Sequence, residues 1–262
     1  MAQEQMIQVI RPRSNWFVES WRHYGPILWR LLPMLLIVYV PMEILGTIIE
    51  QLVGTTGSTS RDIMMSVRLA NALESLIGII AVVGVCLAVR DRREGRMETW
   101  GHYLKRGCAL WGRALGICLW VGLIVGGLTL LFIVPGVIAS VCLALAVQAA
   151  ILLDLSPKQA LSESRRMVKG HWWSTLGVLT LGGVVTALAG LAVALPTGLL
   201  SGVMEGLAEE IGGVSPLFKS LELLLNVVGT TLVDIVGVFW TICMTVWFFR
   251  LREGMKPAQE AV

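Results

Sequence analysis

Three acidic residues stand inside long apolar stretches of this sequence, and they are the residues best suited to chemistry. With a rise of about 1.5 Å per helical residue, Glu43, Glu74 and Asp234 each lie about 20 to 24 Å from the arginine that flanks their stretch. The three carboxylates could therefore share one layer. An ionisable group in hydrocarbon usually faces a partner, a cavity or water, and neighbouring carboxylates can share a proton that a conformational change releases.

Other polar residues recur at helical spacing beside these acids, which predicts that the polar faces point into the helix bundle. The predicted site is a small polar cavity in the outer half of the bundle, formed by Glu43, Glu74, Asp234, Asn71, Asn226, Gln148 and Arg68. Arg68 is placed to reach Glu50 or Glu74. The alternative is structural, because buried acids and amides also hold membrane helices together by bonding one another or the backbone.

The elements that must position these groups are membrane helices. Of the 262 residues, 55% are hydrophobic and only 15% are charged, which is more apolar than a soluble domain. A bilayer requires about 20 apolar residues per helix. Six spans are expected, near residues 27–50, 64–89, 112–134, 136–153, 174–202 and 222–249.

Basic residues predict the orientation of the chain. All but three of the 21 lysines and arginines flank alternate ends of the expected spans; the exceptions are Arg61, Arg68 and Lys219. The positive-inside rule then places both termini in the cytoplasm, and it places the short hairpin at residues 133–136 and the acidic loop at 205–210 outside.

A basic, tryptophan-bearing segment precedes each pair of spans, at residues 15–30, 97–113 and 157–173. Each segment is expected to form an amphipathic helix on the cytoplasmic surface. We therefore predict an all-α polytopic membrane protein, with six transmembrane helices as three hairpins, each preceded by an interfacial helix. The whole chain, 1–262, is expected to be one membrane domain. The similarity suggests a threefold repeat (15–90, 97–154, 157–250), although a shared membrane interface could produce the same pattern.

The third of these segments has the clearest helix signals. Ser156 and Gln159 form a capping box around Pro157, and Gly170 is expected to end the helix. Its basic residues are predicted to contact anionic lipid of the inner leaflet; they are Lys158, Arg165, Arg166 and Lys169. The alternative is that these charges only orient the protein.

The same region resembles a known bacterial family. Pro135 and Gly136 precede a span, Ala160, Leu161 and Ser164 lie in the following helix, and Lys169, Gly170 and Trp172 begin the next span. This pattern is similar to stand-alone inner-membrane proteins of the YciC type, and to the membrane domain fused to some glycerophosphoryl diester phosphodiesterases. The resemblance implies a bacterial inner-membrane protein of undefined role. The phosphodiesterase barrel and its acidic metal motifs are absent from this sequence.

Small residues and enzyme motifs complete the predictions. Gly122 and Gly126 form a GxxxG on the third span, and Gly182, Thr186 and Gly190 form a small stripe on the fifth; close helix packing is expected at both. No Walker loop, HExxH, GxSxG or paired CxxC occurs, so we predict no enzyme activity, cofactor or metal. Prolines in the first and fifth spans could kink those helices.

Two functions remain open at this point. The first is a non-catalytic module that organises lipid or partner proteins, which the basic segments favour. The second is a small-solute or proton-coupled transporter or channel, which the acidic residues favour. Membrane lipid is the expected partner in both cases, and a membrane surface accounts for the basic charge without nucleic acid.

Overall fold

The computed structural model describes residues 15–55, 60–210 and 216–259, and every regular element within these ranges is a helix. The helices are α2 (Trp16–Thr55), α3 (Ser60–Arg93), α4 (Trp100–Leu131), α5 (Ile133–Leu143), α6 (Ala146–Leu152), α7 (Pro157–Val168), α8 (Trp172–Glu210) and α9 (Pro216–Gln259). In this described part, six helical stretches, one of them α5 with α6, are long and apolar enough to cross a membrane. The predicted fold class, an all-α multi-pass membrane protein, is confirmed.

Several helices are longer than the predicted spans. The segment at 15–30 continues without a break into the first span as part of α2, and the segment at 97–113 continues as part of α4. Hydropathy marks the apolar part of a helix, whereas backbone hydrogen bonding continues through polar residues, and in α2 the helix also continues past Pro26. The predicted outer loop at 205–210 likewise lies in the last turns of α8.

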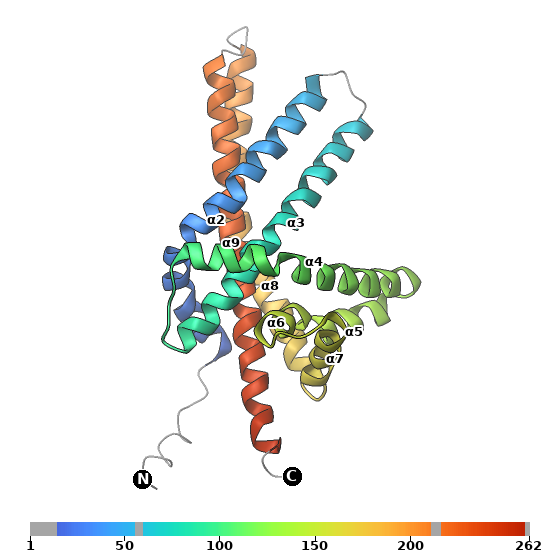
Figure 1. Cartoon of the computed structure of the whole chain (residues 1–262). Helices are drawn as coiled ribbons and strands as arrows, with labels where there is room; N and C mark the ends of the chain where they lie inside the picture. Colours follow the sequence, from blue (N-terminus) through green and yellow to red (C-terminus); the bar gives the residue numbers. More distant parts are fainter. Residues whose placement is uncertain (1–14, 56–59, 211–215, 260–262) are drawn as a thin grey trace.

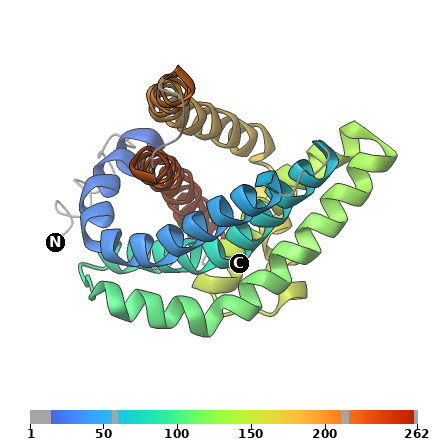
Figure 2. The same ribbon diagram turned by 90° about the horizontal axis from the view of Figure 1, so that it is seen from above.

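Two long hairpins form the centre of the molecule. α2 packs against both α3 and α9, and α9 packs against α8. The N-terminal end of α2 and the C-terminal end of α9 lie at the same end of the molecule, and the α2–α3 and α8–α9 pairs diverge toward the other end (Figure 1). α2 contains Pro26, Pro33 and Pro41 and curves along its course (Figure 2). Proline inside a helix removes a backbone hydrogen bond and bends the axis.

α4 and α5 extend sideways from this centre and run across the direction of α8 and α9 (Figure 1). The hairpin that joins them is apolar and exposed, with Leu130 89% and Ile133 73% accessible. Its outward location remains a prediction.

The core lies near the basic ends of the helices. Ile27 and Leu31 of α2, Val83 and Leu87 of α3 and Val246 of α9 are buried in one apolar cluster. A second apolar cluster, around Phe248 and Met167, contains residues from each of the helices α4, α5, α6, α7, α8 and α9. Far from these clusters the long helices expose leucine, isoleucine and valine, as helices facing lipid do.

The structure confirms the predicted start and end of α7 but places the helix in different surroundings from those predicted. Ser156 and Gln159 form the capping box, and Gly170 has a φ of +87° just beyond the helix end. The face that contains Ala160, Ser164 and Met167 is buried. However, this face packs against protein, chiefly α5 and α6, rather than lying in the membrane surface. An amphipathic pattern cannot distinguish these cases, because a protein core and a lipid layer bury the same apolar face.

The fourth predicted span is broken into α5 and α6. A side chain of α7 forms hydrogen bonds with backbone groups at this break. The Ser164 hydroxyl donates to the Cys142 carbonyl at 2.8 Å and accepts the Leu145 amide at 3.2 Å. Ser164 is fully buried, so water cannot reach these two backbone groups. The hydroxyl supplies the hydrogen bonds that the broken helix does not provide.

Candidate intramembrane acid site

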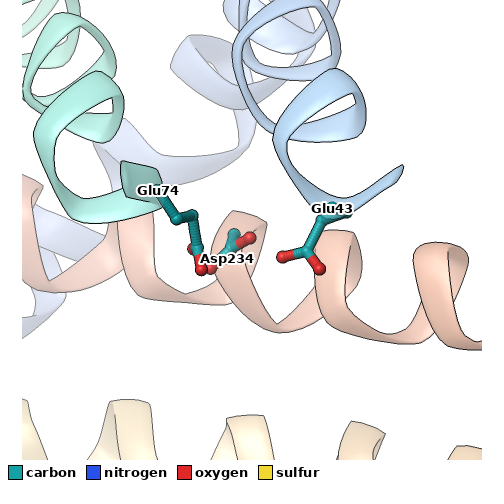
Figure 3. Close-up of side chains that lie close together, drawn as sticks. All are labelled: Glu43, Glu74 and Asp234. Atoms are coloured by element: carbon teal, nitrogen blue, oxygen red, sulfur yellow. The ribbon is translucent and has the colours of Figure 1, made fainter. Parts of the chain in front are cut away.

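Three helices bring the three predicted acids together. Glu43 comes from α2, Glu74 from α3 and Asp234 from α9, which are mutually contacting helices. One carboxylate oxygen from each residue can be chosen so that all lie within 4.8 Å of one another. Asp234 lies between the other two, with Glu74 and Glu43 pointing toward it (Figure 3). The three carboxylates therefore form a compact cluster, which we name the acid cluster.

Among the described residues, no basic side chain forms an ion pair with the acid cluster. None of the ion pairs in the part of the chain that the structure describes includes Glu43, Glu74 or Asp234. Oδ2 of Asp234 is buried and has no hydrogen-bond partner among the described residues. Negative charges this close repel strongly in a medium of low dielectric. A shared proton or a bound cation would relieve that repulsion, and oxygen ligands suit hard cations.

A cavity of about 570 Å³ lies against the acid cluster, between α2, α3, α8 and α9. Asp234 forms part of its wall, together with the polar side chains of Tyr39, Thr186 and Thr241. The remaining lining is mostly alanine, valine, leucine and glycine. Mostly apolar walls with a few convergent polar groups are typical of sites that hold small molecules.

The other four residues of the predicted site do not join this cavity. Asn71 and Arg68 are exposed, and no ion pair connects Arg68 with Glu74. The side chain of Glu50 lies outside the described residues. Asn226 accepts a hydrogen bond from Ser201 of α8 at 3.3 Å.

Gln148 is buried in α6, with an Oε1 that has no hydrogen-bond partner among the described residues, and it is absent from the cavity wall. Helical spacing shows that polar residues share a face, but it does not show which neighbour that face meets.

The cavity wall on α8 was assigned a different role from sequence. Thr186 and Gly190 line the cavity, although their spacing predicted close helix packing. Gly182 does show that packing, because a Cβ there would lie 3.2 Å from Trp240 of α9. A Cβ at Gly122 or Gly126 would meet no atom within 4 Å, so the GxxxG of α4 makes no close contact with the described part of the chain. Small residues allow either close packing or a cavity, and only the neighbouring helix decides which occurs.

The predicted lipid-contacting residues all lie on exposed positions of α7 or just after it: Lys158, Arg165, Arg166 and Lys169. Arg166 also forms an ion pair with Glu163 at 2.7 Å. The polar face of α7 is therefore available to a membrane surface or to another protein.

Comparison of the chain with protein-family models, with curated proteins and with solved structures finds no match.

Proposed function

We propose that this integral membrane protein transports a small polar solute or cation through the cavity between α2, α3, α8 and α9, with a proton or cation held at the acid cluster. The observation that carries the proposal is the meeting of three carboxylates from three helices beside a cavity of about 570 Å³. Packing alone does not require three acids of like charge to meet without a basic partner among the described residues, and intramembrane carboxylates commonly mark ion and substrate pathways.

The arrangement of the helices supports coupling between the acid cluster and movement. Each acid belongs to a different helix, so the charge held at the cluster acts on the separation of α2, α3 and α9. Binding of a proton or cation draws the helices together, and its release favours separation by Coulomb repulsion. A cation-dependent change of this kind would open and close the adjoining cavity.

Flux through proteoliposomes tests the proposal. We expect purified wild-type protein to move protons, sodium ions or a member of a panel of small polar solutes. Glu74→Gln and Asp234→Asn are each expected to lower that flux at least about tenfold, because each removes a carboxylate from the pathway.

The matched control is Asn71→Ala, which changes an exposed polar residue on α3 close in sequence to Glu74. Its flux is expected to stay within about twofold of wild type. Thermal unfolding of each variant establishes that it is folded. Equal losses in the control and acid variants, or no flux from folded wild type, would contradict transport.

The second candidate is a non-catalytic module that organises lipid or partner proteins, and the exposed basic residues of α7 favour it. Its membrane affinity would come from attraction between Lys158, Arg165, Arg166 and Lys169 and an anionic leaflet. In that case, replacing these residues by glutamine would reduce retention of anionic lipid, while Asp234→Asn would leave retention unchanged.

We propose that the protein belongs to the YciC-type family of the bacterial inner membrane, because of the residues that carry the resemblance, and that both of its termini are cytoplasmic. No enzyme activity is part of the proposal. The basic ends of the helices support the orientation by the positive-inside rule.

A further inference from the structure

A second hollow lies at the C-terminal end of α3, beyond the acid cluster near the middle of that helix, where α3 ends and α4 begins. This cleft has a volume of about 210 Å³ and is lined by Arg90, Asp91, Arg96, Glu98, His102 and Arg106. None of these residues lines the larger cavity. We name it the arginine cleft.

The floor of the arginine cleft is fixed by buried groups. Asp91 is only 7% exposed, and its Oδ2 accepts a hydrogen bond from the fully buried Tyr103 hydroxyl at 3.2 Å. The Arg96 amide donates to the Asp91 carbonyl at 2.7 Å, closing a turn in which Gly95 has a φ of +73°. Arg30 of α2 donates to the carbonyls of residues 97 and 98. The turn that contains Asp91, Arg96 and Glu98 is therefore held in place without a ligand.

The arginines of the cleft differ in whether they form ion pairs. Arg90 forms an ion pair with Asp91 at 2.9 Å, and Arg96 forms one with Glu94. Arg106 is exposed and, within the described residues, has neither an ion pair nor a hydrogen bond from its side chain. Its guanidinium offers paired donors of the geometry that matches phosphate oxygens.

Two further features favour an anion beside Arg106. His102 lies one helical turn before Arg106 on α4, so both side chains share a face. The first turn of α4 has no side-chain cap on Thr99, which leaves the positive end of a long helix beside the cleft. Glu98 also lines the cleft, and its carboxylate can accept a hydrogen bond from a hydroxyl or ammonium group next to the anion.

The position of the cleft identifies the source of the anion. It lies where the apolar stretch of α3 gives way to charged residues, and Trp100, next to the cleft, is 40% exposed. Trp29, adjacent to Arg30, is 78% exposed. Tryptophan prefers the headgroup level of a bilayer, where lipid phosphates lie. We propose that the arginine cleft binds the phosphate group of a phospholipid headgroup, with Arg106 as its principal ligand.

Binding of a short-chain phospholipid to the purified full chain in detergent tests this proposal. We expect dihexanoyl phosphatidylglycerol to bind wild type, and Arg106→Gln to weaken binding at least about tenfold because a charge-assisted hydrogen bond is lost. Lys105→Gln is the matched control. It removes the same charge from the neighbouring exposed residue, which does not line the cleft, so binding is expected to change less than about twofold.

Competitors distinguish the possible sources of phosphate. We expect glycerol phosphate and inorganic phosphate to compete more weakly than the phospholipid, and dihexanoylglycerol, which has no phosphate, not to compete. Equal weakening by Lys105→Gln and Arg106→Gln would overturn the proposal, because general attraction would then explain binding. Competition by dihexanoylglycerol would also overturn it. Because the cleft shares no lining residue with the transport cavity, failure of lipid binding leaves the flux experiment independent.

Discussion

At the scale of single residues, the buried acidic side chains differ in whether their oxygens have hydrogen-bond partners. Asp234 keeps a buried oxygen without a hydrogen-bond partner among the described residues, whereas Asp91 uses its carboxylate on Arg90 and Tyr103. A buried polar group that lacks a partner costs free energy unless a ligand supplies one. This difference explains why Asp234 is assigned to binding and Asp91 to holding the floor of the arginine cleft.

Ser164 provides a test of the break between α5 and α6. Ser164→Ala is expected to destabilise the protein by about 1 to 3 kcal/mol, because the Cys142 carbonyl and the Leu145 amide each lose a bond made inside the core. The free energy of unfolding in mixed micelles measures this loss.

Ser162→Ala is the control for this substitution. Ser162 lies on the exposed face of the same helix, so its replacement is expected to change stability by less than about 0.5 kcal/mol. If both serine variants proved equally stable, the break would not depend on the Ser164 hydroxyl.

At the scale of elements, close crossings between helices depend on particular glycines. A Cβ at Gly107 of α4 would lie 2.8 Å from the Ile80 carbonyl oxygen of α3. That oxygen belongs to backbone, so it cannot move aside as a flexible side chain can. The approach of α4 to α3 in turn places His102 and Arg106 beside Arg90.

Gly107→Ala is therefore expected to destabilise the protein by about 1 to 3 kcal/mol through overpacking. Gly112→Ala, later in the same helix, meets no atom of the described structure within 4 Å. It is expected to leave stability unchanged or to raise it by up to about 1 kcal/mol, because alanine favours helix over glycine. Thermal unfolding of both variants gives the comparison, and a stable Gly107→Ala protein would show that α3 and α4 are able to separate.

At the scale of the whole molecule, the basic residues and the arrangement of the helices indicate the same orientation in the membrane. The N-terminal end of α2 and the C-terminal end of α9 lie at the end of the molecule that also contains α7 (Figure 1). Glu19 of α2 binds Arg250 of α9 at 2.6 Å and Arg93 of α3 at 3.3 Å, which ties the three helices together near the termini. Basic residues gathered at one end predict that this end remains in the cytoplasm.

Single cysteines test this orientation in a cysteine-free background. Ser162→Cys on α7 is expected to react with a membrane-impermeant maleimide only in inside-out vesicles. Met64→Cys, which is exposed near the other end of α3, is expected to react only from the outside of intact cells. Reaction of both positions from one side would contradict the predicted orientation, and the unlabelled cysteine-free protein gives the background.

Much of the architecture follows from sequence because each step is local. The apolar stretches are long enough to span lipid, and Ser156, Gln159 and Gly170 determine where α7 begins and ends. The separation of each acid from its flanking arginine also placed Glu43, Glu74 and Asp234 at similar depth, since a helix has a fixed rise per residue.

The tertiary structure decided which faces meet. It separated Asn71, Arg68, Asn226 and Gln148 from the cavity wall, and it buried the apolar face of α7 against protein. It also brought Arg106 to the end of α3 and formed the arginine cleft. Helical spacing determines the residues that share a face, but the crossing angles and contacts between helices depend on side-chain packing across the whole molecule. For this reason the sequence determined the membrane class and the depth of the acids, whereas the cavity, the acid cluster and the arginine cleft required the assembled helices.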